Sequence, residues 1–291
     1  MTSINLISNF GEDAKLENVR VFNHTVAWFL RKALEKKGIE VRFVKEHDLL
    51  VNSPPNADHT LVISAIGMHY WAGTHRFVRG KTPTVRSKIR KATKGKVAVY
   101  IDADYGTWIN QFDYLFSVIQ PRSGNPKCVY AGWGADPEYC YPEQEERAVF
   151  LDTFNLKKPR GRKSIYEIYE EVLPTLKIKV YRPKPFYHKD KRLNWPNFQK
   201  IMRKCHYYCC TQLGDSGLTR IEAATCGALL VVPNLLYKPR TMASLEHRRW
   251  TTKQGLIKIL KTETDPEAIR EKALKHSWDK VATRILNRLN K

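Results

Sequence analysis

Apolar runs alternate with amphipathic segments along the first half of this chain, and this alternation restricts the fold more than any other feature. Segment 24–38 repeats apolar residues at helical spacing and ends at Gly38. The short apolar runs are segments 3–8, 39–45, 58–67, 96–104 and 112–119. Such runs are typical of buried strands in a parallel sheet, with helices as connections. The pattern predicts β-α-β units, in which ligands bind beyond the carboxyl ends of the strands.

A second series of the same kind occupies the second half. The expected strands are segments 148–154, 177–183, 206–212 and 228–234, and the expected helices are segments 163–176, 194–205, 265–276 and 277–290. Between the two series, segment 131–147 is rich in Gly, Pro and acidic residues. We place a domain boundary in this segment and expect two α/β domains.

The charge balance indicates a negatively charged partner. Fifty Lys and Arg residues against 29 Asp and Glu give a net charge of +21, which attracts nucleic acid, anionic lipid or a phosphorylated substrate. One stretch between the third and fourth expected strands contains only basic charges, and it ends with Lys96. Its candidate nucleic-acid ligands are Arg76, Arg79, Lys81, Arg86, Lys88, Arg90, Lys91 and Lys94. The alternative interpretation of this stretch is a solvated charged face.

Other features of the sequence indicate a reduced compartment. Residues 1–13 lack the pattern of a signal peptide, and no apolar run reaches the length of a membrane span, so we expect a cytoplasmic protein. The six cysteines form no Cys-x-x-Cys pair, and we interpret them as reduced, buried residues. His206, near Cys205 and Cys209, is a minor alternative as a zinc ligand.

The stretch GDSGLTRIEAATCGALLVVP, residues 214–233, combines a turn, a short helix and an apolar strand. We expect the helix to begin near Ser216 or Gly217, where free backbone N–H groups suit a diphosphate. Glu222 lies within this helix beside small residues. Its carboxylate either faces the packed side, where sugar hydroxyls would be suitable partners, or faces solvent.

Three segments resemble the GT-B glycosyltransferases. Residues 214–233 resemble the nucleotide-sugar motif of that family, residues 131–142 its interdomain linker, and residues 276–286 its closing helix. The resemblance implies an α/β protein with the GT-B fold, in which two Rossmann-like domains face each other across a cleft. Residues 1–140 would form the acceptor-binding domain and 141–275 the nucleotide-sugar-binding domain. Residues 276–291 would form the closing helix, packed back on the N-terminal domain.

The resemblance also implies roles for single residues. Glu222 would bind the ribose of the donor, and Gly214 stands where retaining members often have an acid, so we expect inversion. The remaining donor candidates are Ser216, Gly217, Leu218, Arg220, Arg162, Lys163 and Gly11. Arg220 would meet either phosphate or water, and the basic loop of Arg162 and Lys163 is either a phosphate ligand or solvated.

Sugar transfer requires a base for the proton of the acceptor. Asp102 and Asp104 end one expected strand of the N-terminal half, and His69 follows another. These three residues are our catalytic candidates, because acceptors bind at the strand ends of the N-terminal domain in the resembled fold. The alternative roles are capping for the two aspartates and packing for His69.

Together these features predict an enzyme similar to the bacteriophage glycosyltransferases that glucosylate hydroxymethylated pyrimidines in duplex DNA. The partners would be double-stranded DNA and a UDP-sugar as co-substrate, with glucose as the expected sugar. We expect no tightly bound cofactor, and a divalent metal is compatible with the sequence but not required by it. The protein would act as a monomer in the cytoplasm, that of an infected host cell if it is phage-encoded. The alternatives are a GT-B enzyme for a cell-surface glycan or lipid and a non-catalytic nucleic-acid-binding protein.

Overall fold

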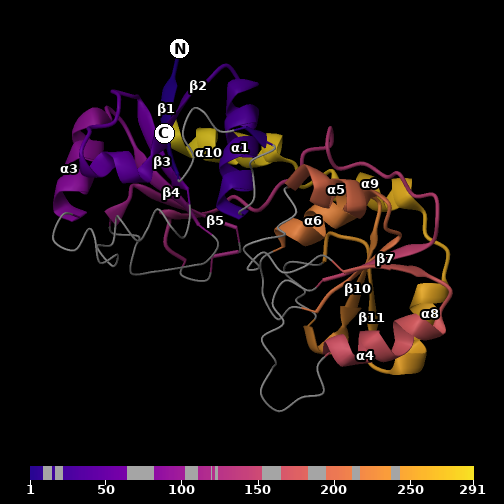
Figure 1. The fold of residues 1–291 in the computed structure, drawn as a ribbon. Coiled ribbons are helices and arrows are strands. Elements are labelled where there is room, and N and C mark those ends of the chain that lie inside the picture. Colours follow the sequence, from indigo (N-terminus) through magenta and orange to yellow (C-terminus); the bar gives the residue numbers. More distant parts are fainter. Residues whose placement is uncertain are drawn as a thin grey trace. The chain divides into compact units, whose positions relative to one another are not determined.

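The fold is described from a computed structural model, which covers residues 1–8, 15–16, 22–63, 82–101, 111–118, 120–121, 124–152, 165–182, 195–211, 217–236 and 243–291. The chain divides into two units (Figure 1): Met1–Trp133 with Trp278–Lys291, and Gly134–Ser277. The division after Trp133 lies inside segment 131–147 and before residue 140.

The first unit contains a parallel sheet of six strands in the order β2-β1-β3-β4-β5-β6. Its strands are β1 (Ser3–Ser8), β2 (Glu40–Lys45), β3 (His59–Ile63), β4 (Val97–Ile101), β5 (Tyr114–Ser117) and β6 (Cys128–Tyr130). Its helices are α1 (Phe22–Glu35), the 3-10 helix η2 (Glu46–Leu50), α3 (Thr82–Ala92) and α10 (Trp278–Leu289). Helix α10, from the end of the chain, packs against α1.

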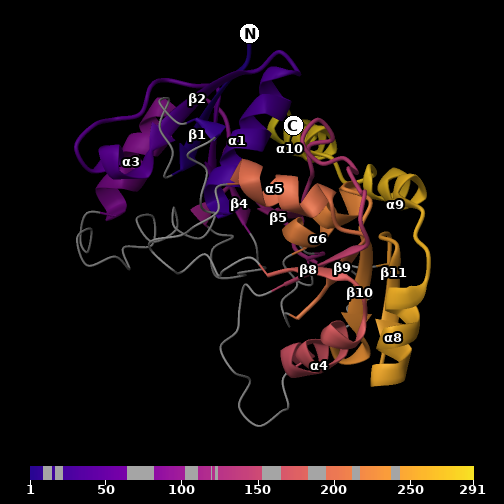
Figure 2. The same cartoon turned by 45° about the vertical axis from the view of Figure 1, so that its right-hand side comes forward.

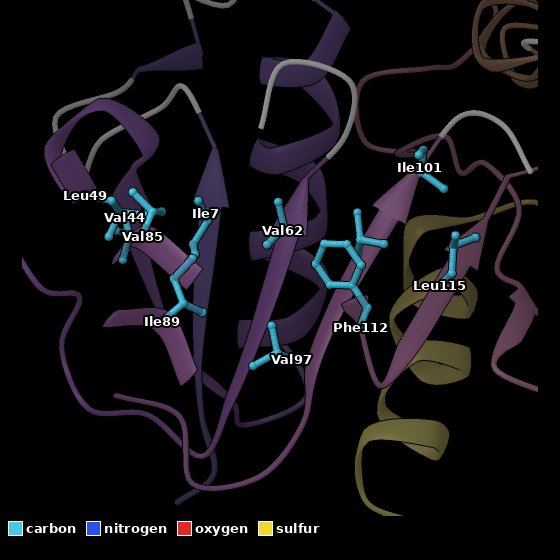
Figure 3. Close-up of a cluster of buried hydrophobic side chains, with 11 residues drawn as sticks. Ile7, Val44, Leu49, Val62, Val85, Ile89, Val97, Ile101, Phe112 and Leu115 are labelled. Carbon is cyan, nitrogen blue, oxygen red and sulfur yellow. The ribbon is translucent and has the colours of Figure 1, made fainter. Parts of the chain in front are cut away.

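One row of register partners crosses this sheet and carries its core. Val44, Ile7, Val62, Val99 and Leu115 are successive partners on five neighbouring strands, and all are buried. Val85 and Ile89 of α3 pack on this row (Figure 3), so that α3 covers this face of the sheet. The apolar runs were correctly interpreted as strands because parallel strands covered on both faces need apolar side chains on both.

The second unit contains a parallel sheet of five strands in the order β11-β10-β9-β7-β8. Its strands are β7 (Ala148–Leu151), β8 (Lys179–Tyr181), β9 (Tyr207–Cys209), β10 (Leu229–Pro233) and β11 (His247–Trp250). Its helices are α4 (Ile165–Val172), η4 (Leu173–Thr175), α5 (Trp195–Arg203), α6 (Leu218–Thr225), η5 (Asn234–Leu236), α8 (Lys253–Lys261) and α9 (Pro266–Ala273). Helices α4 and α8 lie on one face of the sheet and α5 and α6 on the other (Figures 1 and 2).

The strand order places a switch point in each sheet. In the first sheet, β2 lies on one side of β1 and β3 on the other. In the second sheet, β8 lies on one side of β7 and β9 on the other. The strand order therefore reverses between β1 and β3 and between β7 and β9. Open α/β sheets bind ligands at such points, beyond the carboxyl ends of the strands. The expectation of two α/β domains with parallel sheets is confirmed. The strands β6 and β11 and the helix α8 were not predicted.

The described part of the chain has no helix with the length and apolar character of a membrane span. All six cysteines are free thiols, and five of them are buried. Among the same residues, no cluster of three or more His, Cys, Asp or Glu side chains is arranged to hold a metal ion.

Candidate functional site

Helix α6 begins where the sequence predicts and lies beyond the carboxyl end of β9. Gly217 is its N-cap residue and Leu218 its first residue, and both are buried. Because Gly217 has no side chain to cap the helix, the first-turn N–H groups depend on other partners. These groups and the positive end of the helix dipole can receive an anion at this edge of the sheet.

Glu222 is on the packed side of α6. The residue is 4% exposed, and its Oε1 accepts a hydrogen bond of 2.9 Å from Nε1 of Trp195, the first residue of α5. Burial raises the pKa of Glu222 to about 7, although the side chains of Trp195 and Gln199 act to lower it. The alternative of a solvent-facing glutamate is therefore wrong.

Gln199 lies one turn after Trp195 and is fully buried. Its Oε1 accepts hydrogen bonds from the thiols of Cys140, at 3.5 Å, and Cys226, at 3.6 Å. Burial raises the pKa of the Cys140 thiol well above its usual value, and Cys226 and Glu222 raise it further. Both thiols donate to the oxygen of Gln199, which fixes the orientation of its amide group.

A second buried polar cluster joins the ends of β7 and β9 to α6. Asp152 directly follows β7, and its Oδ2 accepts a hydrogen bond of 2.7 Å from the hydroxyl of Tyr208. Thr211, after β9, donates to the backbone oxygen of Asp152. Arg220, in the first turn of α6, is 3% exposed, so the alternative in which it faces water is wrong.

The charge of Arg220 is stabilised by its neighbours. Burial acts to lower the pKa of its guanidinium, but Cys210, Tyr208 and Asp152 raise it, and the net shift is upward. Burial also raises the pKa of the Cys210 thiol, to about 12, although Arg220 acts to lower it. These charged and polar residues form a buried cluster at the switch point between β7 and β9.

Comparison with known proteins gives a match in structure only. No family model matches the chain, and no curated protein matches it. An alpha-glucosyltransferase in complex with UDP and a 13-mer DNA containing a central A:G mismatch aligns with a TM-score of 0.61 and 12% identity over 100% of both chains. An alpha-glucosyltransferase in complex with UDP aligns with a TM-score of 0.56 and 13% identity, again over 100% of both chains.

The two parallel sheets and these alignments decide the architecture. The chain has the GT-B fold. A third structure, an alpha-glucosyltransferase in complex with UDP and a 13-mer DNA containing a HMU base, aligns with a TM-score of 0.56 and 12% identity over 99% of both chains.

Most of the predicted site residues of this GT-B chain lie outside the described residues. They are the catalytic candidates Asp102, Asp104 and His69, the donor candidates Gly11, Arg162, Lys163 and Ser216, and the cations Arg76, Arg79 and Lys81. By sequence, these positions follow the carboxyl ends of β1, β3, β4, β7 and β9. The structure brings together Gly217, Leu218, Arg220 and Glu222 on one helix.

The described cations of the basic stretch lie on and just after α3 and differ in their contacts. Nζ of Lys88 donates to four backbone oxygens of residues 49–52, at distances of 3.0 to 3.4 Å, at the end of η2. Arg90 forms an ion pair of 2.6 Å with Asp113. Lys94 is highly exposed and lies 4.0 Å from Asp58. The exposed Lys91 and the half-buried Arg86 complete the set, and burial lowers the pKa of Arg86.

Lys88 and Lys91 also line a groove of about 570 Å³ between α3 and the segment before β3. The other lining residues are Ser53, Pro54, Asn56, Ser87 and Ala92. None of these carries an acidic group, so the groove suits an anionic group.

Sequence reasoning missed Trp195, Gln199, Asp152 and Tyr208. Asp152 had a usable signal, because an acid directly after an apolar strand is a candidate in any open α/β sheet. Trp195 is 27 residues from Glu222, and no local pattern links the two positions.

Proposed function

We propose that this chain is a glycosyltransferase that moves glucose from UDP-glucose to a hydroxymethylated base in double-stranded DNA. The observation that supports this most is the alignment over the whole length of both chains with an alpha-glucosyltransferase that was solved with UDP and DNA. The net charge of +21 is the independent support for a polyanionic acceptor.

The donor would bind at the carboxyl edge of the second sheet. In this proposal the diphosphate meets the first-turn N–H groups of α6, near Ser216, Gly217 and Leu218. The ribose hydroxyls bond to Glu222, because an ionised carboxylate is a strong acceptor. Arg220, a buried residue in the first turn of the same helix, supplies positive charge near the diphosphate. Arg162, Lys163 and Gly11 remain donor-binding candidates on sequence grounds.

The chemistry would be a direct displacement at the anomeric carbon. The base removes the proton of the hydroxymethyl group as its oxygen forms a bond to C1 of glucose. The bond between C1 and the diphosphate oxygen breaks, and UDP leaves with the electron pair. Asp102, Asp104 and His69 remain the candidates for the base. The helix dipole and cations at the donor site would stabilise the charge that develops on UDP.

The DNA would be held mainly by its phosphates. Among the described cations, Lys91 and Lys94 have exposed ammonium groups, whereas Lys88 and Arg90 contact protein atoms. Arg76, Arg79 and Lys81 belong to the connection between β3 and α3 and complete the proposed contact set, together with Arg86. Contacts of this kind give affinity without sequence readout.

Radiolabelled UDP-glucose tests the proposal against both alternatives. The protein is mixed with hydroxymethylated duplex DNA, with unmodified duplex DNA and with a lipid extract. Label in the hydroxymethylated duplex alone supports the proposal, and label in lipid would instead support an enzyme for a lipid or glycan acceptor. A protein that binds DNA but transfers no sugar would be a non-catalytic DNA-binding protein.

A matched pair of variants links any transfer to the proposed site. Glu222→Ala should abolish UDP-glucose binding, measured by calorimetry, while circular dichroism shows an intact fold. Glu267→Ala is the control, because Glu267 is an exposed glutamate at the start of α9 in the same unit. Unchanged donor affinity of Glu222→Ala would remove the ribose role.

We also propose inversion at the anomeric carbon, on the ground that Gly214 occupies the position of the second acid. Glucose is α-linked in UDP-glucose, so inversion yields a β-linked product. The coupling constant of the anomeric proton in the glucosylated nucleoside, measured by NMR, separates the two outcomes. An α-linked product, as the name of the aligned alpha-glucosyltransferases gives for those enzymes, would mean retention and would contradict this proposal.

A further inference from the structure

Trp195 connects helices α5 and α6 of the second unit at the candidate donor site. It is the first residue of α5 and directly follows segment 183–194, and its indole N–H bonds to Glu222 on α6 at 2.9 Å. Both side chains are buried, with 6% and 4% of their surfaces exposed. The carboxylate that the proposed function assigns to ribose therefore already has one partner within the protein.

The indole of Trp195 also packs against Tyr139. The ring of Tyr139 packs edge-on against it, with the ring centres 5.5 Å apart. An edge-to-face contact of this kind favours one ring orientation. The N–H of Trp195 therefore points to Glu222 through packing that exists without a ligand.

Gln199 acts on the same carboxylate from the next turn of α5. The thiols of Cys140 and Cys226 donate to its oxygen, and the Gln199 side chain acts to lower the pKa of Glu222. The amide nitrogen of Gln199 makes no hydrogen bond of normal geometry to a described residue. Trp195 thus supplies the hydrogen bond to Glu222 that has normal geometry, at 2.9 Å, and the side chain of Gln199 acts in the same direction on the pKa of this carboxylate.

Because Glu222 is buried, this hydrogen bond affects whether its carboxyl group is protonated or charged. A buried acid without donors takes up a proton, and a protonated acid is a weaker acceptor for sugar hydroxyls than a carboxylate. A donor that contacts one oxygen favours the charged form and leaves the second oxygen for a ligand. Since the carboxylate is shared in this way, loss of the indole N–H should weaken ligand binding without any loss of ligand contact.

We infer that Trp195 is a positioning residue for the nucleotide sugar and acts through Glu222. This inference rests on the proposed function, in which Glu222 binds the ribose. The titratable groups of the described chain that face this site are the thiols of Cys140 and Cys226, with Asp136 beyond Cys140. Burial raises the pKa of the Cys140 thiol well above its usual value, and both thiols donate hydrogen bonds to Gln199, so a titration near neutrality would report on Glu222.

The test is the affinity for UDP-glucose as a function of pH, measured by calorimetry without an acceptor. For the wild type, affinity should rise with pH through a midpoint near the pKa of Glu222, about 7. In Trp195→Phe the midpoint should move upward, so that the affinity is about tenfold lower at pH 7 and the deficit shrinks by pH 9. An equal deficit at every pH, or no deficit, would overturn the inference.

Trp250→Phe is the matched control for this variant. Trp250 is also buried in the second unit, and its indole N–H also forms a buried hydrogen bond, of 3.1 Å, to Tyr169. Both variants lose one buried indole hydrogen bond, but only Trp195 contacts Glu222. A pH midpoint that shifts equally in both variants would show a general effect on stability and would overturn the inference.

A measurement on the wild type covers the case in which Trp195→Phe does not fold. In protein with ¹⁵N-labelled tryptophan, the indole N–H signal of Trp195 should shift with a midpoint near pH 7 and shift again when UDP-glucose is added. Glu222→Gln should remove the pH response and thereby identify the signal. If the wild type binds UDP-glucose and no indole signal responds to it, the inference about Trp195 is wrong while the proposed function stands. If it binds neither UDP-glucose nor UDP, the proposed function fails.

Discussion

The hydroxyl of Tyr208 donates a hydrogen bond of 2.7 Å to the carboxylate of Asp152, and both residues are almost completely buried. The bond joins the carboxyl ends of β9 and β7, the two neighbouring strands between which the second sheet reverses its order. A charged group in the protein interior depends on such partners, because burial without them costs several kcal/mol. The switch point of this sheet is therefore held together by polar contacts.

Tyr208→Phe should lower the free energy of unfolding by about 2 kcal/mol, because the buried carboxylate of Asp152 loses a donor while the ring of residue 208 keeps its stacking on Phe150. Urea denaturation measures the change. Tyr114→Phe is the control, since Tyr114 is a half-buried tyrosine of the first unit that packs on Phe116. Equal effects of the two substitutions would contradict a special role for the Asp152 contact.

Glu222 should make the stability of the protein depend on pH. Its pKa is raised from 4.5 to about 7 in the folded state, so the folded state binds the proton more tightly than the unfolded state. Stability should therefore fall as the pH rises from about 4.5 to about 7, by about 3 kcal/mol in total. Glu222→Gln cannot ionise and should be more stable than the wild type by about this amount at pH 8.

Thermal unfolding of both proteins between pH 4.5 and pH 8 tests this dependence. The two stabilities should approach each other at pH 4.5, where Glu222 of the wild type is protonated in the folded state and half protonated in the unfolded state. Glu267→Gln, at an exposed position, should follow the wild type at every pH. Parallel curves for Glu222→Gln and the wild type would rule out the raised pKa.

Seven of the nine strands that the sequence predicted lie in the interior of their sheets, and the other two, β2 and β8, are edge strands. Among the interior strands, β4, β7 and β10 are buried throughout and consist almost entirely of apolar residues, because they are covered on both faces. The edge strand β11 has the sequence HRRW, with Arg248 and Arg249 exposed, and therefore lacks an apolar run. The edge strand β6 has three half-buried residues. Edge strands pair on one side alone, and their composition indicates a strand only weakly.

The candidate site was predictable to the extent that it depends on local sequence. The Gly/Ser turn was sufficient to locate the start of α6, but the small residues beside Glu222 left both a packed and a solvent-facing carboxylate possible. The contact between Trp195 and Glu222 was not predictable, because it depends on how α5 and α6 pack on the same sheet face. A single sequence contains the partners of such a contact but not their pairing.

Lys91→Gln should weaken binding to duplex DNA by an amount that shrinks as salt rises, and should lower the slope of log affinity against log salt by about 1. Lys91 is exposed and lines the acid-free groove beside α3. Fluorescence anisotropy of a labelled duplex at several salt concentrations measures the slope. A loss of affinity that is the same at all salt concentrations would mean that Lys91 acts through structure.

Lys88→Gln should behave differently from Lys91→Gln, although the two lysines are three residues apart. The ammonium of Lys88 bonds to backbone oxygens at the end of η2, where a cation also complements the helix dipole. Its loss should cost about 1 to 2 kcal/mol of stability in urea denaturation. Unchanged stability together with a large loss of DNA affinity would show that Lys88 is a DNA ligand instead.

Gly227→Ala should destabilise the second unit strongly, because two separate effects act at this position. Gly227 ends α6 with a φ of +80°, which a residue with a side chain adopts only at a cost. A Cβ atom at this position would also lie 2.7 Å from Cβ of Pro266, the first residue of α9. The helix that carries Glu222 packs against α9 at this point, so Ala would force the two helices apart.

Gly38→Ala separates the two effects. Gly38 follows α1 with a φ of +76°, but no atom lies within 4 Å of the position that its Cβ would occupy. It should therefore cost only the backbone strain, about 1 kcal/mol, whereas Gly227→Ala should cost about 3 kcal/mol. Because the crowding at Gly227 acts on α6, Gly227→Ala should also reduce the affinity for UDP-glucose. Gly38→Ala should leave this affinity unchanged. Equal losses of stability in urea denaturation would mean that the contact with Pro266 relaxes without cost.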